Sequence, residues 1–387
     1  MTYDPLPDLM PPAVPLPDEV ASLRGEVRAF VAGQIRGGAW QPRVDGWLSG
    51  WNPQFSKELA ARGWVGMAIP EEYGGHGAGA LARYVVIEEL LAAGAPVAAH
   101  WMADRQIAPA LLRHGTEAQR AEFLPRIAAG EFFAAVALSE PDTGSDLASV
   151  RTRAVPAADG WRLTGTKIWT SGAHRADAIF VLARSAPADA HDRHAGLSQF
   201  IVDPKAPGVQ VRPIPILTGS HDFNEVVLED VFVPAGRLLG EPGGGWRQVT
   251  SELAYERSGP ERFLSTFPLL VALVGELAAG DTDPTAAAGV GALVTRLWTL
   301  RQMSVSVAAA LEAGEAPALA AALVKDVGTR FESTIAEAAR QLCAKPGPGG
   351  DFSRLLADAV LHSPAFTLRG GTNEVLRGIV ARGLGLR

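Results

Sequence analysis

Apolar residues recur at helical spacing through the first third of the chain. Within residues 20–31 one face collects Val20, Leu23, Val27, Phe30 and Val31. Residues 81–93 and 107–114 repeat the pattern, and glycines at positions 74, 75, 77 and 79 interrupt it with a loop. Spacings of three and four residues place side chains on one face of an α-helix. The sequence therefore predicts an N-terminal helical domain over residues 17–129.

The pattern changes after Glu131. Short runs rich in β-branched and aromatic residues alternate with turn residues, at 161–164, 178–183, 199–202, 209–212 and 225–228. Several short strands at such spacing are typical of an antiparallel barrel or sandwich. The sequence therefore predicts a middle β-domain over residues 130–239.

A second helical region follows the glycines at positions 240, 243, 244 and 245. It is rich in alanine, with Leu293, Leu297 and Leu300 at helical spacing, and residues 346–350 are expected to form a loop between two helices. Residues 1–16 carry five prolines and are expected to be a flexible arm. The fold class predicted is α+β, with an N-terminal helical domain, a middle β-barrel or sandwich and a C-terminal helical bundle over residues 240–387.

Composition and charge narrow the class of protein. Hydrophobic residues make up 47% and charged residues 20%, which fits a globular enzyme. The net charge of −7 and the lack of a basic block argue against nucleic-acid binding. No apolar run approaches the length of about 20 residues that spans a bilayer, and the longest, 263–274, is expected to be a buried helix. Because the acidic, proline-rich start is unlike a signal peptide, we expect a cytoplasmic protein without membrane attachment.

The chain offers no expected metal site. Cys343 is its single cysteine, which excludes a CxxC site and an internal disulfide. His100 and His174 lack partners at metal-ligand spacing, so each is expected to be an ordinary core or surface residue.

Two segments of the predicted β-domain combine strand residues with glycine and small hydroxylated residues. They are residues 137–146 (ALSEPDTGSD) and 165–172 (GTKIWTSG). Such residues let backbone N–H groups approach a flat, electron-poor ring. We therefore interpret them as flavin-facing segments.

These two segments resemble the signature of the acyl-CoA dehydrogenase family, in which they wrap the isoalloxazine ring of FAD. Three further segments match the family in order, at 69–75 (IPEEYGG), 223–234 (FNEVVLEDVFVP) and 370–377 (GGTNEVLR). The resemblance implies one subunit in which two helical domains sandwich the β-domain. It also implies an FAD cofactor, an acyl-CoA substrate and an electron-transferring flavoprotein or similar acceptor.

The reaction implied by the resemblance removes two hydrogens from Cα and Cβ of an acyl thioester. A base takes the α-proton while a hydride passes from Cβ to the flavin N5. Because the α-proton is weakly acidic, hydrogen-bond donors must stabilise the developing enolate oxygen. The base is a carboxylate in a largely apolar pocket, where desolvation makes it more basic.

The resemblance identifies a candidate base. In much of the family it is a glutamate directly before the Gly-Thr of the C-terminal motif, where this chain has Gly370. A minority carries it in a Glu-Arg pair on the first long C-terminal helix, and this chain has Glu256 before Arg257. The two observations together favour Glu256 as the catalytic base, against a solvated helix residue in a charge-rich stretch. The Gly370 N–H is then expected to bind the thioester carbonyl together with a ribityl hydroxyl.

For the cofactor, the resemblance places Leu138 and Ser139 near the pyrimidine edge of the flavin. It places Trp169 on the ring and Ser171 near N5, and Ser145 where the flavin and the pantetheine arm of CoA meet. The alternatives are a sheet-core tryptophan for Trp169 and turn caps for Ser139 and Ser145.

Three further positions follow from the same resemblance. Thr372 and Glu374 reach the cofactor from the C-terminal segment, and Arg257 shapes the CoA site. The alternative for Arg257 is an ion pair with a nearby glutamate.

Two motifs of the family are missing. The family usually has Arg-x-x-Phe-Gly after the first C-terminal helix and Gly-Gly-x-Gly-Tyr after a later glutamine, and these bind the pyrophosphate and adenine of a neighbouring subunit's FAD. Here 260–267 (PERFLSTF) runs into 280–284 (GDTDP), and 341–349 reads QLCAKPGPG. Losing these contacts weakens FAD binding. Either the cofactor is held differently, or an unlike chain completes the site.

The function predicted is FAD-dependent α,β-dehydrogenation of an acyl-CoA, with tolerance for branched or bulky acyl groups. One alternative is a cofactor-poor partner subunit of a heteromeric enzyme. Another is a flavin monooxygenase or oxidase on the same fold, which has no need of a base at Glu256. We expect a homo-oligomer or heteromer, because the helices of 290–342 hold more apolar surface than one bundle face needs. The residues concerned include Leu293, Trp298, Leu311 and Leu323.

Overall fold

The chain separates into two compact units. In the computed structural model, the described residues are 9–187, 191–251, 257–280, 283–344, 347 and 350–386. One unit comprises residues 1–50, 79–96 and 253–387, and will be called the bundle unit. The other comprises residues 51–78 and 97–252, and will be called the sheet unit. The helices predicted for residues 17–129 are thus shared between the two units.

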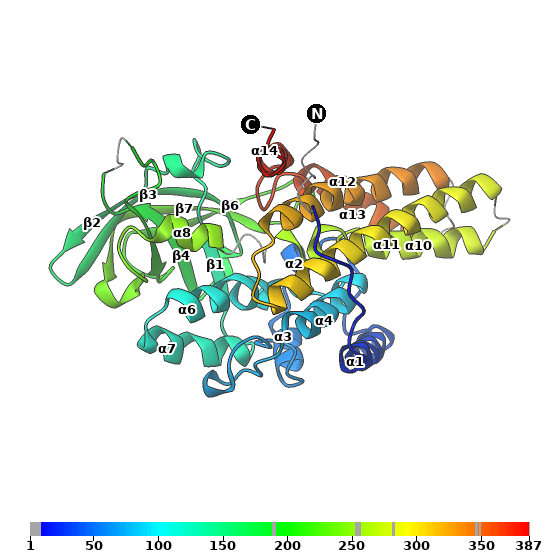
Figure 1. Ribbon diagram of the computed structural model, residues 1–387, viewed down its shortest axis with the longest axis horizontal. Coiled ribbons are helices and arrows are strands. Elements are labelled where there is room, and N and C mark those ends of the chain that lie inside the picture. The colour runs from blue at the N-terminus through cyan, green and yellow to red at the C-terminus, as the bar shows by residue number, and fades with distance from the viewer. Residues whose placement is uncertain are drawn as a thin grey trace, which may run out of the picture. The chain divides into compact units, whose positions relative to one another are not determined.

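The sheet unit contains an eight-stranded sheet with the order β6-β7-β3-β2-β4-β5-β8, and β1 also pairs with β4 (Figure 1). β1 and β2 pair with β4 in parallel, whereas the other pairings are antiparallel. The predicted antiparallel domain is therefore a mixed, largely antiparallel sheet. The strands are β1 Ala134–Ala137, β2 Arg153–Ala157, β3 Gly160–Ser171, β4 Ala178–Arg184, β5 Leu197–Val202, β6 Val209–Ile214, β7 Phe223–Pro234 and β8 Leu238–Leu239.

Short helices complete the sheet unit. They are α3 Pro53–Ala60, α5 Ala98–Met102, α6 Ala108–His114, α7 Glu117–Ala128 and α8 Gly245–Ser251, with a π-helical turn over Ala103–Ile107. Thr116 and Gln119 form a capping box that starts α7. Leu111 and Phe123 of α6 and α7 join Phe180 of β4 in one buried cluster. Burial of these apolar side chains fixes the helices on the sheet.

The bundle unit is helical. Its elements are α1 Asp18–Arg36, α2 Gly46–Ser49, α4 Ala80–Ala92, α10 Phe267–Ala278, α11 Pro284–Glu312, α12 Ala318–Leu342, α13 Asp351–Phe366 and α14 Asn373–Gly383. Figure 1 shows α10, α11, α12 and α13 running alongside one another. In α12, Val324, Phe331 and Ile335 lie on one buried face at helical spacing. The predicted face of α1 is also present, with Val27 and Val31 buried.

One sequence expectation needs correction, and another stays a prediction. Val14 and Leu16 pack against a buried cluster of α4 and α11, and Met10 packs against a cluster of α11 and α12. The described part of the predicted arm thus makes apolar contacts, and the flexibility of residues 1–16 stays a prediction. The stretch 263–274 is not a single buried helix, because α10 begins at Phe267 and leaves Val271 exposed. Among the described residues, no helix has the length and hydropathy needed to cross a membrane.

Candidate functional site

The two predicted flavin-facing segments lie side by side in the sheet unit. The Lys167 ammonium of β3 donates to Glu140 Oε1 at 2.9 Å and to the Leu138 carbonyl at 3.0 Å. The Ile168 N–H donates to the Ser139 carbonyl at 2.9 Å. Lys167 is fully buried. An ion pair and a backbone hydrogen bond thus join the loop after β1 to β3.

Glu140 organises the rest of the loop. Its carboxylate accepts from the N–H of Arg151 at 2.7 Å, from the N–H of Thr152 at 2.8 Å and from the Thr152 hydroxyl at 2.6 Å. Burial raises the pKa of Glu140, but the Lys167 charge and these donors outweigh it, so the net shift is downward. Burial lowers the pKa of Lys167 to about 8, against the opposing charge of Glu140. Both groups are therefore charged at neutral pH, and sequence reasoning did not select either of them.

Trp169 occupies an irregular point of β3. The register against β7 shifts between Lys167 and Thr170, and Trp169 has a φ of 59°. A bulky residue at positive φ is strained, and such strain concentrates at functional sites. Its side chain is 54% exposed and meets Phe223 edge-on, with 5.9 Å between ring centroids. Trp169 is therefore not the sheet-core tryptophan considered as the alternative.

The bulge is held from β7. The buried Asn224 amide donates to the Thr170 carbonyl at 3.0 Å, and its oxygen lies 2.8 Å from His221 Nε2. His221 stacks on His174 with 4.0 Å between ring centroids. Ser171 pairs with Phe223 in the β3–β7 register. The exposed indole and the serine beside it are thus fixed by the neighbouring strand.

The predicted hydroxyl ligands are accessible. Ser145 is exposed, and Ser139 and Ser171 are half-buried. Within the described part of the chain, none of these three hydroxyl groups makes a hydrogen bond, so the turn-cap alternative for Ser139 and Ser145 has no support. Leu138 packs against a cluster that includes Leu182. An exposed indole on a rigid bulge, next to hydroxyls and a pinned backbone, fits a flat heteroaromatic ring.

Those remaining predicted residues that the structure describes lie in the bundle unit. Gly370 and Gly371 both have left-handed φ values, 67° and 85°. The Gly370 carbonyl accepts from Arg257 Nε at 3.3 Å, and the Gly371 carbonyl accepts from Lys325 Nζ at 2.6 Å. Across the residues that the structure describes, the Gly370 N–H donates to no acceptor. Gly370 therefore offers a main-chain N–H donor just before two carbonyls that Arg257 and Lys325 hold in place.

Thr372 and Glu374 begin the helix that follows. Thr372 caps α14 by accepting from the Val375 N–H at 3.4 Å. Glu374 is exposed in the first turn, and hydrogen bonds from its own N–H and from Thr372 lower its pKa.

Glu256, the predicted base, lies outside the described residues, as does most of the segment 345–349. Among the residues described, no group of three His, Cys, Asp or Glu side chains is placed to hold a metal ion.

Three domain models of one family match the chain in order. They are the acyl-CoA dehydrogenase N-terminal domain at residues 17–131, the middle domain at 135–231 and the C-terminal domain at 281–385. The matched order is helical, sheet and helical, which confirms the predicted fold class.

Curated proteins of the same family align over nearly the whole length. Acyl-CoA dehydrogenase IpdE1 of Mycobacterium tuberculosis is 35% identical, with 95% of this chain and 98% of that protein covered. Acyl-CoA dehydrogenase FadE34 of the same organism is 33% identical, with 95% of this chain and 49% of that protein covered.

Solved structures superpose on this chain over nearly its whole length. The Tcur3481-Tcur3483 steroid ACAD superposes with a TM-score of 0.86 at 29% identity, covering 96% of this chain and 98% of that chain. The ChsE4-ChsE5 complex from Mycobacterium tuberculosis superposes with a TM-score of 0.82 at 28% identity, covering 97% of this chain and 99% of that chain.

Proposed function

The chain belongs to the acyl-CoA dehydrogenase family, and we propose that it removes the α-proton and a β-hydride from an acyl-CoA with FAD as cofactor. The observation that carries the cofactor assignment is the pair of segments joined by Glu140 and Lys167, with Trp169 exposed on a strained bulge. FAD, when bound, supplies the hydride acceptor. The chain's own residues bind and orient the cofactor and the substrate, and one of them removes the proton.

Glu256 is the proposed base. Gly370 has no side chain to take a proton, and Glu256 directly precedes Arg257, which is buried and hydrogen-bonded to the Gly370 carbonyl. A carboxylate next to such a segment takes the α-proton, and desolvation on substrate binding raises its basicity.

Gly370 is the proposed donor to the thioester carbonyl. Among the described residues its N–H donates to no acceptor, and its carbonyl accepts from Arg257. A preorganised main-chain donor stabilises the oxyanion that develops as the α-proton leaves. The loss of a side chain at this position therefore leaves the donor function intact.

Leu138, Ser139, Trp169 and Ser171 are proposed to hold the flavin ring. The indole offers a flat, exposed face, and the unoccupied hydroxyls of Ser139 and Ser171 offer hydrogen bonds to polar ring atoms. Ser145 is proposed to contact both cofactor and CoA, and Thr372 and Glu374 are proposed to contact the cofactor.

A large acyl group and an unlike partner chain are proposed for this enzyme. The absence of the Arg-x-x-Phe-Gly and Gly-Gly-x-Gly-Tyr motifs removes expected contacts to FAD, and a second chain is proposed to supply them. One similar structure is named a steroid ACAD with two chain names, and another is named a complex of two chains. These names favour a bulky, polycyclic acyl group and heteromeric assembly. An electron-transferring flavoprotein or similar protein is the proposed electron acceptor.

The surface of α11 supports assembly. Trp298 is 61% exposed and Val294 is also exposed, whereas Leu293, which the sequence placed in the same apolar surface, is only 4% exposed. Exposed apolar side chains close together on one helix mark an interface. Light scattering on the purified protein checks this, because a stable monomer at micromolar concentration contradicts it.

The proposed function is tested by expressing the chain alone and with candidate sister chains. Bound FAD is quantified, and flavin absorbance is followed without oxygen as acyl-CoAs of increasing bulk are added. We expect bleaching with bulky acyl-CoAs and full FAD content only with a partner. Failure of every combination to bind FAD contradicts the assignment. FAD binding with no bleaching by any acyl-CoA favours the monooxygenase or oxidase alternative, whereas bleaching activity that stays with the sister chain while this chain carries little FAD favours the cofactor-poor supporting subunit.

A further inference from the structure

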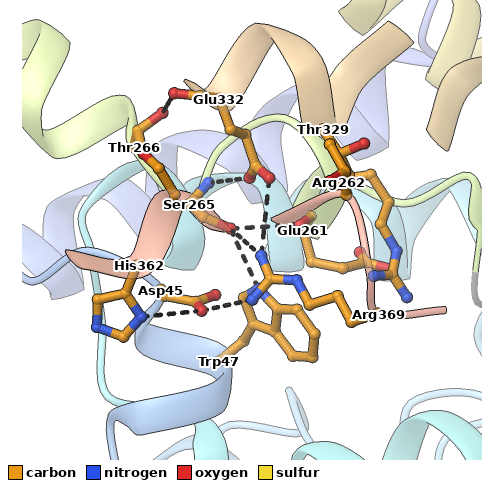
Figure 2. A network of polar contacts seen from close by, with 12 residues as sticks. Asp45, Trp47, Glu261, Arg262, Ser265, Thr266, Thr329, Glu332, His362 and Arg369 are labelled. Atoms are coloured by element: carbon orange, nitrogen blue, oxygen red, sulfur yellow. Dashed lines mark hydrogen bonds and ion pairs between the residues drawn. The ribbon is translucent and has the colours of Figure 1, made fainter. Parts of the chain in front are cut away.

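Arg369 directly precedes the proposed oxyanion donor Gly370, and its side chain is held in a network inside the bundle unit (Figure 2). One guanidinium nitrogen hydrogen-bonds Asp45 Oδ2. Another donates to Ser265 Oγ at 3.1 Å and lies 3.7 Å from Glu332 Oε2. The guanidinium carbon lies 4.4 Å from the ring centroid of Trp47, a cation–π distance. Arg369 is therefore fixed on several sides at once.

The partners of Arg369 are themselves fixed. Asp45 is fully buried, its N–H donates to the Ser265 carbonyl at 3.0 Å, and its Oδ2 lies 3.5 Å from His362 Nδ1. The Ser265 N–H donates to Glu332 Oε1 at 2.8 Å. These residues come from the start of α2, the turn before α10, α12 and α13. Four segments thus contribute to the network around one guanidinium.

The peptide after Arg369 depends on such an anchor. Two consecutive left-handed glycines have a soft backbone, because glycine allows many φ and ψ values. The Arg369–Gly370 peptide is planar, so the Arg369 Cα and carbonyl set the plane in which the Gly370 N–H lies. Arg257 and Lys325 hold the carbonyls on the other side of this peptide. The direction of the N–H is therefore set from both sides.

We infer that Arg369, anchored by Asp45, is a positioning residue that aims the Gly370 N–H at the thioester carbonyl. This inference rests on the proposed function of Gly370 as oxyanion donor. Hydrogen-bond strength falls steeply with misalignment, and a displacement of about 1 Å in a reacting group can cost about 100-fold in rate. A soft diglycine peptide without its anchor loses this alignment while substrate affinity, which has other sources, is retained.

The competing explanation is that the network only stabilises the bundle. The two explanations differ in the state of the bound carbonyl. A well-aimed donor polarises the thioester carbonyl and lowers its stretching frequency, whereas a stabilising ion pair leaves the frequency unchanged in any variant that folds. Infrared difference spectra of a bound enoyl-CoA with a ¹³C-labelled thioester carbonyl therefore read out positioning directly.

The test compares the assembled parent enzyme with Arg369→Lys and Asp45→Asn. Lysine keeps the charge but loses the forked contacts. Asparagine keeps the shape of Asp45 and tolerates its left-handed backbone. Arg340→Lys is the matched control, since Arg340 pairs with Glu337 on the surface of the same bundle. Melting temperature and FAD content establish that each variant is assembled.

We expect both test variants to move the carbonyl band toward its frequency in free enoyl-CoA. We also expect kcat to fall by about tenfold or more, with KM changed by less than about threefold. Folded variants with an unshifted band overturn the inference, and so does loss of folding in both, which assigns the network to stability alone. If the parent binds enoyl-CoA with a polarised carbonyl but never reduces its flavin, the proposed function is contradicted. The infrared comparison of parent and variants still tests the positioning role of Arg369 in that case.

Discussion

Lys167 and Glu140 form an ion pair of 2.9 Å that is almost completely buried and joins two segments 27 residues apart in sequence. Buried charges are costly unless they are paired and fully hydrogen-bonded. Here the charges are paired and further hydrogen bonds support them, because Glu140 accepts from Thr152 and Arg151 and Lys167 also donates to Leu138. The shape of the proposed flavin platform therefore depends on electrostatics as well as on packing.

Replacing Lys167 with methionine is expected to destabilise the protein and release the flavin. The change leaves Glu140 buried without its counter-charge, which costs about 3–5 kcal/mol. Urea unfolding gives the free energy, and absorbance gives the FAD retained per chain. Lys57→Met is the matched control, because Lys57 pairs with Glu131 at the same 2.9 Å in the same unit with both side chains about half exposed. That control is expected to change stability by less than about 1 kcal/mol, and equal effects in the two variants contradict the argument.

Replacing Trp169 with glycine is expected to separate stability from cofactor binding. Glycine relieves the strain at φ 59°, about 1–2 kcal/mol, which offsets the lost edge contact with Phe223, about 0.5–1.5 kcal/mol. Stability without cofactor should therefore change by less than about 1 kcal/mol while FAD affinity falls.

Trp161→Gly is the control for this experiment. Trp161 lies on the same strand but packs against the sheet core and meets Phe200 edge-on at 5.4 Å. A loss of about 3 kcal/mol is expected there. If Trp169→Gly destabilises the flavin-free protein as much, Trp169 is a packing residue and its proposed role is wrong.

Glu332 is expected to make stability depend on pH near neutrality. Burial raises the pKa of Glu332 to about 7, against the opposing charge of Arg369. The folded protein then keeps a proton that the unfolded chain loses near pH 4.5. The stability from Glu332 is present below pH 4.5 and is lost as the pH rises through about 7.

Glu332→Gln removes this titration. Its unfolding free energy relative to the parent should rise between pH 5 and 8 by about 3 kcal/mol, because each pKa unit corresponds to about 1.4 kcal/mol. Glu337→Gln, an exposed position on the same helix, should not show this trend. Parallel stability curves for Glu332→Gln and the parent between pH 5 and 8 contradict the assignment.

The helices and strands could be predicted from the sequence because the spacing of apolar residues within an element depends on only a few neighbouring positions. The helical face with Val27 and Val31 and the short strands around Phe180 follow from spacing alone. Position on a helix did not predict which apolar face is covered. Leu293 and Trp298 both belong to α11, yet one is buried and the other exposed, because burial depends on which helices pack nearby.

Long-range polar pairs were beyond sequence reasoning. Asp45 and Arg369 are 324 positions apart, and no local pattern pairs them among the other charged residues. Lys167 lies inside a recognised segment, but its burial and its pairing with Glu140 depend on how that segment packs in the folded sheet unit. Motif resemblance located the segments, and the folded sheet determined which side chains face inward and which face outward.

Glu256→Gln is the decisive test of the proposed chemistry. Glutamine preserves size but cannot take the α-proton, and a general base contributes about 10²–10⁴-fold to the rate. The rate of flavin reduction by acyl-CoA should fall by a factor at the upper end of that range or larger, and the spectrum of the bound FAD should stay unchanged. Glu337→Gln is a surface control that should reduce its flavin at the parent rate.

Gly370→Glu added to Glu256→Gln asks whether the other family position can take over as base. The φ of 67° at Gly370 strains any L side chain, so we expect at most partial recovery. Recovery above the single variant shows that a carboxylate was the missing group. If Glu256→Gln reduces its flavin as fast as the parent, Glu256 is a helix-surface charge, and proton abstraction must be assigned to another residue.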